Sequence, residues 1–90
     1  MRTLEVIKVR TTGKDRDALD AFLRSLGQVR EESLLSVKWY RHASLYSDLA
    51  VHFLWSEPII GPRGSSLALR LAETLGAFGL VDHSVWVEGS

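Results

Sequence analysis

The chain has 90 residues, 46% of them hydrophobic, and its 11 basic and 11 acidic residues cancel to a formal net charge of zero. A chain of this length forms one domain, residues 1–90, with a thin core that favours association with another copy. Zero net charge removes the attraction that supplies most nonspecific binding to nucleic acid and anionic membranes. The lack of cysteine excludes disulfides, a thiolate nucleophile and a cysteine-ligated metal site.

The first segment of the chain, MRTLEVIKVR, interleaves charged and apolar residues, unlike the apolar run of a signal peptide. No stretch approaches the ~20 apolar residues of a membrane-spanning helix. We therefore expect a soluble cytoplasmic protein with no nucleic-acid or membrane partner. Thr3 to Thr11 is rich in β-branched residues and stops at Gly13, which predicts a first strand ended by a turn.

A helical pattern follows the first strand. From Asp15 onward, apolar residues recur at helical spacing: Ala18, Leu19, Phe22, Leu23 and Leu26. Charged residues take the opposite side of this helix, which is expected to end near Gly27 or one turn later. The segment Arg30-Glu31-Glu32 then connects the helix to the next strand.

Two strands follow, in 35–45 and 49–55, and both carry their large apolar residues at odd positions. Facing residues of an antiparallel pair share a sheet face, so this common parity requires a hairpin loop with an odd number of residues. A three-residue loop, Tyr46 to Asp48, would set His42 directly opposite His52, whereas a shift by one residue would make them diagonal neighbours.

The rest of the chain predicts a loop, a helix and a last strand. Ser56 to Ser66 holds both prolines and two glycines and reads as the loop. Ser65 or Ser66 is expected to cap a second helix whose apolar stripe is followed by Gly79. This stripe consists of Leu67, Leu71, Leu75 and Phe78. Leu80 to Glu88 forms the final strand.

The element order β-α-β-β-α-β predicts a ferredoxin-like α+β sandwich, with a four-stranded antiparallel sheet and two helices on one of its faces. The opposite face is expected to carry a partly apolar set of side chains: Tyr40, His42, Ala50, His52 and Leu54. A second copy of the chain, packed sheet to sheet, would bury this face and enclose a cavity. We therefore expect a homodimeric α/β-barrel.

The end of the third strand reads His52-Phe53-Leu54-Trp55-Ser56-Glu57. This aromatic and hydrophobic run followed by Trp-Ser resembles the dimeric α/β-barrel proteins of the antibiotic biosynthesis monooxygenase type, and the order of elements is similar along the whole chain. The resemblance implies a cleft between the sheet and the helices of each protomer. It also implies oxidation of a small aromatic molecule without a metal or flavin cofactor.

The two histidines of the strand pair are the candidate catalytic residues. His42 and His52 could accept a proton from a phenol or enol near neutral pH, while Tyr40 and Trp55 hold the aromatic ring. The alternative is that both imidazoles only pack in the dimer interface. Two histidines without a carboxylate at fixed spacing are a poor metal site, so no metal is expected.

Other motifs give weaker candidates. Glu57 and Arg63 flank the loop before the second helix and are candidate ligand-binding residues at the mouth of a cleft, although GPRGSS also suits ordinary helix capping. The run Asp82-His83-Ser84 cannot form a triad locally, because consecutive strand residues point to opposite faces.

Two other functions fit the same order of elements. One is a small-molecule-binding or regulatory module of the ACT-like kind, for which the turn TTGKD around Gly13 would supply the binding site. The other is an assembly domain without catalysis. We carry both as alternatives to an enzyme.

Overall fold

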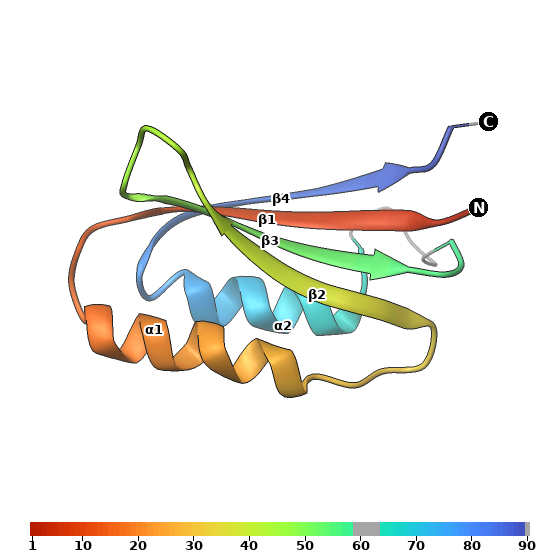
Figure 1. Ribbon diagram of the computed structural model, residues 1–90, viewed down its shortest axis with the longest axis horizontal. Coiled ribbons are helices and arrows are strands. Elements are labelled where there is room, and N and C mark those ends of the chain that lie inside the picture. The colour runs from red at the N-terminus through yellow and green to blue at the C-terminus, as the bar shows by residue number, and fades with distance from the viewer. Residues whose placement is uncertain (59–63, 90) are drawn as a thin grey trace.

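The computed structural model describes residues 1–58 and 64–89. Its elements are β1 (Thr3–Thr11), α1 (Arg16–Ser25) with a following 3-10 turn (Leu26–Gln28), β2 (Leu34–Arg41), β3 (Asp48–Trp55), α2 (Ser66–Leu75) and β4 (Gly79–Val87). The strands form one antiparallel sheet in the order β2-β3-β1-β4, and Figure 1 shows both helices on the same side of it. The predicted ferredoxin-like arrangement is confirmed.

Local sequence explains most of these boundaries. β1 has the predicted bounds, and Gly13 follows it with a positive φ of 85°, a conformation that glycine adopts without strain. The Ser65 hydroxyl accepts a hydrogen bond of 3.1 Å from the Ala68 N–H, so Ser65 is the cap of α2. Neither helix in the described part of the chain is long and apolar enough to cross a membrane.

The end of α2 differs from the prediction. The helix stops at Leu75, with Gly76 as its cap, and Phe78 belongs to the turn that follows. Gly79 begins β4 instead of ending the helix. A Cβ atom on Gly79 would collide with the carbonyl group of Arg10 on β1, so this glycine is required by the close approach of two strands.

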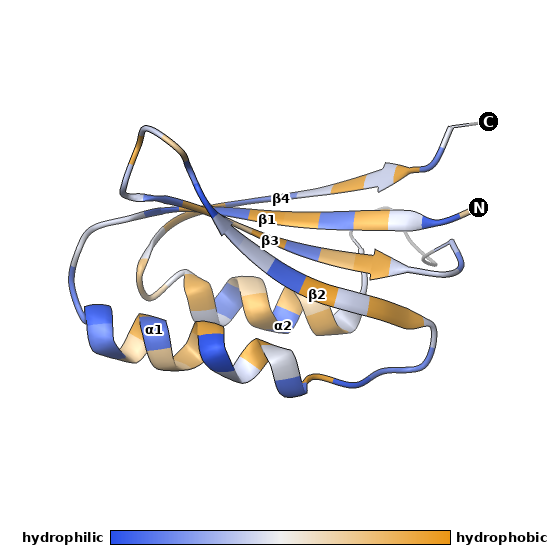
Figure 2. Cartoon of the chain, in the orientation of Figure 1, coloured by the Kyte–Doolittle hydropathy of each residue, from blue (hydrophilic) through white to orange (hydrophobic). Residues whose placement is uncertain are grey.

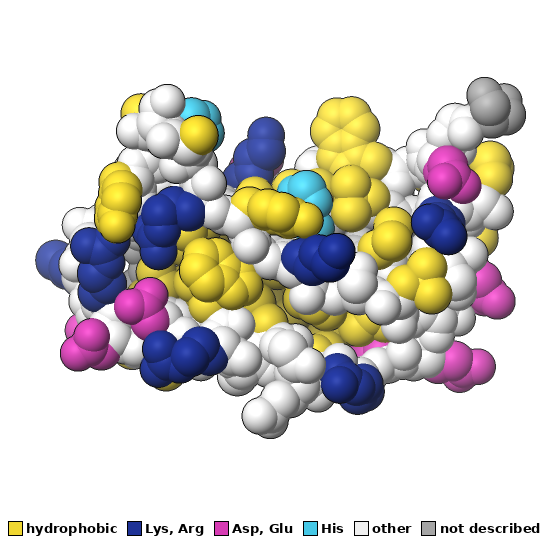
Figure 3. Space-filling view, viewed as in Figure 1, with side chains coloured by type: hydrophobic (Ala, Val, Ile, Leu, Met, Phe, Trp, Pro, Cys, Tyr) yellow, Lys and Arg dark blue, Asp and Glu magenta, His cyan; other side chains and the backbone are white. Residues whose placement is uncertain are grey.

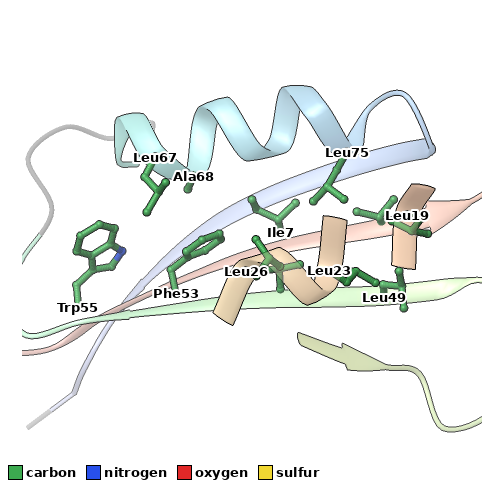
Figure 4. Packing of buried hydrophobic residues seen from close by; sticks show 12 residues of the cluster. Ile7, Leu19, Leu23, Leu26, Leu49, Phe53, Trp55, Leu67, Ala68 and Leu75 are labelled. Atoms are coloured by element: carbon green, nitrogen blue, oxygen red, sulfur yellow. The ribbon is translucent and has the colours of Figure 1, made fainter. Parts of the chain in front are cut away.

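The hydrophobic core lies between the sheet and the helices. Figure 4 shows Ile7 and Phe53 pointing from the sheet toward α2, and Leu19 and Leu23 reaching the same layer from α1. The helices in Figure 2 alternate between hydrophobic and hydrophilic residues, as expected for helices that bury only one side. The odd-numbered residues of β1 and β3 therefore face the helices, and the even-numbered residues face away.

The β2–β3 hairpin has the predicted parity but a different register. Arg41 pairs with Leu49, and the His42 N–H donates a 2.9 Å hydrogen bond to the Asp48 carbonyl oxygen, so residues 43–47 form an odd-numbered turn. The predicted three-residue loop is wrong. His42 lies beside Asp48 and not opposite His52, whose partner on β2 is Lys38.

The start of β2 also departs from simple alternation. The register shifts between Leu34 and Ser36, so Leu34 pairs with Trp55 while Leu35 is exposed. A bulge of this kind lets one strand carry an extra residue. The prediction that Leu35 joins the apolar side of the strand is therefore wrong. Trp39 and Trp86 are also exposed in the single chain.

Candidate functional site

The helix-free face of the sheet carries a groove of about 430 Å³, which we call the open-face groove. It runs across all four strands, and its lining includes Lys8, Tyr40, His42, Ala50, Leu80 and Asp82. The volume falls in the range of about 300–1,000 Å³ that is typical of small-molecule sites. The structure thus places two of the predicted site residues, Tyr40 and His42, in one groove.

His52 lies at the edge of this groove. It neighbours Ala50 on the same face of β3, and its ring packs against Tyr40 with the centroids 4.9 Å apart and the planes inclined by 59°. Burial, and to a lesser extent the positive charge of Lys8, lower the pKa of His52 below the ordinary value of 6.5. His52 is therefore neutral at pH 7 and has a free lone pair with which to accept a proton.

We expect the His52 ring to titrate below pH 6.5 in an NMR titration of its Cε1–H resonance. The pKa of His52 is lower in the folded chain than the 6.5 of the unfolded chain, so the unfolded chain binds the proton first as the pH falls. The contribution of His52 to the free energy of unfolding is therefore complete above pH 6.5 and is lost as the pH falls through the pKa of the folded chain. Lys8→Gln should raise the pKa, and Lys14→Gln, away from this pair, should not. A native pKa at or above 6.5 would contradict the assignment.

His42 has a structural task in the hairpin. Its Nδ1 accepts hydrogen bonds from the backbone N–H groups of Ser44 and Leu45, at 3.0 and 2.9 Å. The ring therefore holds the turn and is a neutral acceptor at that nitrogen. His52 lies four residues further along β3 than Asp48, the neighbour of His42, which separates the two backbone positions by about 13 Å along the sheet. They do not form a pair.

The other predicted site residues lie elsewhere. Trp55 has the opposite orientation from Tyr40 and is buried on the helix side of the sheet, so one ligand cannot contact both residues within one chain. Glu57 is exposed just after β3. Arg63 lies outside the described residues. The expectation that Tyr40 and Trp55 hold one aromatic ring is therefore corrected for the single chain, while the roles of Glu57 and Arg63 stay predictions.

A buried polar cluster on the helix side was missed by the sequence analysis. The Glu5 carboxylate on β1 is 0% exposed, and four donors surround it. Trp55 Nε1–H donates to Oε1 at 2.8 Å and Ser65 Oγ–H to the same oxygen at 2.6 Å. The Ser65 N–H donates to Oε2 at 3.0 Å, and His83 Nε2 lies 2.9 Å from that oxygen. Since an ionised carboxylate only accepts, Nε2 carries the proton in this arrangement.

The surroundings of the buried polar cluster are tightly filled. A Cβ atom on Gly64, whose φ is 93°, would collide with the Glu5 carboxylate and the His83 ring. Thr3, next on the same face of β1, has a buried hydroxyl with no hydrogen-bond partner among the described residues. The lining of the cluster by four different segments indicates that Glu5 fixes the start of α2 against the sheet.

One signal for this cluster was present in the sequence. Glu5 occupies an odd position of β1 between Thr3 and Ile7, where an apolar residue is expected on a core-facing side. A buried acid of this kind requires hydrogen-bond donors. The opposite orientation of His83 and Ser84 was predicted and is confirmed, since the Ser84 hydroxyl accepts from Trp86 on the open face while His83 reaches Glu5.

No three His, Cys, Asp or Glu side chains come together as a metal site in residues 1–58 and 64–89. The open-face groove and its edge carry side chains with chemistry of their own. They include the Tyr40 phenol, the Lys8 side chain and the His42 imidazole in the lining, and the neutral His52 imidazole at the edge. Such a set can bind an aromatic ring, accept a proton from it and stabilise the resulting anion.

Comparison with known proteins gives a likeness in fold. No protein-family model and no curated protein matches this sequence. The solved structure of Rv0793 from Mycobacterium tuberculosis is similar, with a TM-score of 0.74 and 19% sequence identity over 100% of this chain and 97% of that chain. At this identity the likeness supports the ferredoxin-like fold of the chain and carries no argument about its activity.

Proposed function

We propose that this chain forms a homodimer through the helix-free face of its sheet and binds a small aromatic or enolic molecule in the open-face groove. The observation that carries the proposal is the groove itself, with Tyr40 and Lys8 in its wall and the neutral His52 at its edge. In the proposed reaction His52 removes a proton from the bound molecule.

Exposed apolar side chains support the dimer. Leu80 and Trp86, both on the open face of β4, are 77% and 61% exposed, and Tyr40 is also exposed. Figure 3 shows hydrophobic side chains and histidine protruding on the upper, helix-free side of the molecule. A second copy packed on this side would remove these groups from water, and its own sheet would form the far wall of a closed cavity.

The charges of the groove suit proton removal. Lys8 and Asp82 are paired positions of β1 and β4, and Lys8 also faces Ala50 on β3. A cation beside the bound molecule favours its deprotonated form, just as Lys8 disfavours the protonated form of His52. Lys8 would therefore stabilise a phenolate or enolate, while His52 takes the proton.

A reaction of that anion with oxygen requires no further cofactor. In the balanced form, one CH2 carbon of the substrate loses two hydrogens and becomes a carbonyl carbon. One atom of O2 enters the carbonyl group, and the other leaves as water. The substrate supplies the electrons, and the protein contributes binding, proton transfer and exclusion of bulk water.

Oxygen uptake tests this proposal. With a panel of phenols, quinols and enolisable aromatic ketones, we expect uptake above a protein-free blank for at least one compound. His52→Gln should lower the rate by about 100-fold, because a positioned general base contributes roughly that much or more. Arg24→Gln, in the exposed last turn of α1 on the helix side of the sheet, is the control and should retain the activity.

The dimer is tested separately by the native mass in solution. The unaltered chain is expected to have twice the mass of one copy, and Trp86→Glu should shift it toward the monomer by placing a charge in the interface. A monomeric unaltered chain would contradict the barrel. A dimer that shows no uptake with any compound would contradict the reaction.

A further inference from the structure

A second cavity lies at one end of the molecule, away from the helix-free face. It measures about 240 Å³ and opens between the β1–α1 turn and the β2–β3 hairpin. The side chains that matter here are Lys14 and Arg16 from the turn and the start of α1, and Arg41 and Tyr46 from the hairpin. We call this cavity the hairpin pocket.

Two arginines converge on one aromatic ring in the hairpin pocket. The guanidinium carbon of Arg16 lies 5.2 Å from the centroid of the Tyr46 ring, and that of Arg41 lies 5.0 Å from the same centroid. Arg41 Nη1–H also donates to the Tyr46 carbonyl oxygen at 3.1 Å, which fixes the guanidinium group. The Tyr46 side chain thus holds two cations close together, although its residue is 69% exposed.

The hairpin pocket has an excess of positive charge in a chain whose formal net charge is zero. Lys14, Arg16 and Arg41 line it, and Asp20 is the one acidic residue in its lining. Within the described part of the chain none of these three cations forms an ion pair with a carboxylate. Figure 3 shows several basic side chains at the left end of the molecule, with acidic side chains just below them. Their mutual repulsion is relieved when an anion binds among them.

We propose that the hairpin pocket binds the phosphate group of a small molecule. A phosphate monoester carries about −1.5 to −2 charges at pH 7, which matches three cations and one acid better than the single charge of a carboxylate does. Guanidinium groups bind phosphate through paired N–H donors. The pocket is smaller than the roughly 300 Å³ at which sites for whole drug-sized ligands begin, so it suits one anionic group of a ligand.

The hydroxyl groups next to the hairpin pocket already form hydrogen bonds within the protein, so the cations are the groups that would bind the phosphate. Thr11 Oγ1–H donates to the Ser47 carbonyl oxygen at 3.0 Å, and Ser47 Oγ–H donates to Asp48 at 3.2 Å. Thr12 Oγ1 accepts from the Lys14 N–H at 3.4 Å. These hydroxyls hold the turn and the hairpin together, so binding depends on the charged side chains and weakens with added salt.

Binding of inorganic phosphate and of phenyl phosphate, followed by amide NMR shifts of the full chain, tests this site. We expect saturable shifts in residues 11–16 and 46–47 with both probes. Arg16→Gln should weaken binding by about tenfold or more, because it removes a charge-assisted contact. Arg24→Gln removes the same charge from the other end of α1 and is expected to bind phosphate as the unaltered chain does.

Arg41 needs a second variant because it also supports the hairpin. Arg41→Gln should weaken binding, and Arg41→Lys should restore part of it if charge is what matters. Equal losses in Arg16→Gln and Arg24→Gln, or shifts spread over the whole chain, would overturn the site in favour of general charge attraction. His52→Gln should bind phosphate normally, so this test is independent of the proposed reaction.

Discussion

Replacing Glu5 with Ala is expected to lower the free energy of unfolding by roughly 3–5 kcal/mol, because it removes the acceptor of a buried hydrogen-bond network and each buried donor left without a partner costs about 1–3 kcal/mol. The carboxylate is fully buried and accepts from Trp55, Ser65 and His83. Without it, three polar groups remain in the interior with fewer partners, and a void replaces the side chain. Chemical denaturation followed by circular dichroism measures the loss.

A matched control is Glu73→Ala, an exposed acid on α2, for which we expect a change within about 0.5 kcal/mol. A double-mutant cycle with His83→Ala separates the pair from the rest of the cluster. Residues in one network show coupling energies of about 0.5–3 kcal/mol, and a coupling near zero would mean that Glu5 and His83 act independently. A Glu5→Ala chain as stable as Glu73→Ala would contradict the buried cluster itself.

The second large effect is expected at Phe53 in the centre of the core. Phe53→Ala should cost about 3–5 kcal/mol, because the side chain is fully buried on β3, one of the two central strands, and faces α2. Thermal unfolding and denaturant titration both report this loss. Leu69→Ala, on the exposed side of α2, is the control and should change stability by much less. Comparable losses in the two variants would contradict the packing of the core.

Much of the fold was predictable because side-chain periodicity reports which face of an element is buried. The bounds of β1 and the cap of α2 follow from local chemistry, namely β-branched residues before Gly13 and the hydroxyl of Ser65. The parity of the hairpin was also correct. The shared odd positions of the apolar residues require an odd number of residues in the hairpin loop, but they do not distinguish three residues from five. The register of β2 and β3 is therefore known only from the structure.

The candidate site was less predictable for related reasons. His42 closes its own turn through Nδ1, and this local contact sets the hairpin and separates His42 from His52. The partners of Glu5 are 50, 60 and 78 residues away along the chain, so no local pattern connects them. Such contacts appear only after β1, β3, β4 and the start of α2 are brought together.

The position of β1 in the sheet has a consequence for folding kinetics. β1 is the first strand along the chain, yet it pairs on one side with β3 and on the other with β4, the last strand. Contacts between such distant segments give a high contact order. Folding is then slow, because the entropy of closing long loops is lost before the strand contacts that compensate for it can form. Until β4 arrives, one edge of β1 has unpaired backbone groups that can pair with another chain. The interval before β4 docks is therefore when this protein is most prone to aggregate.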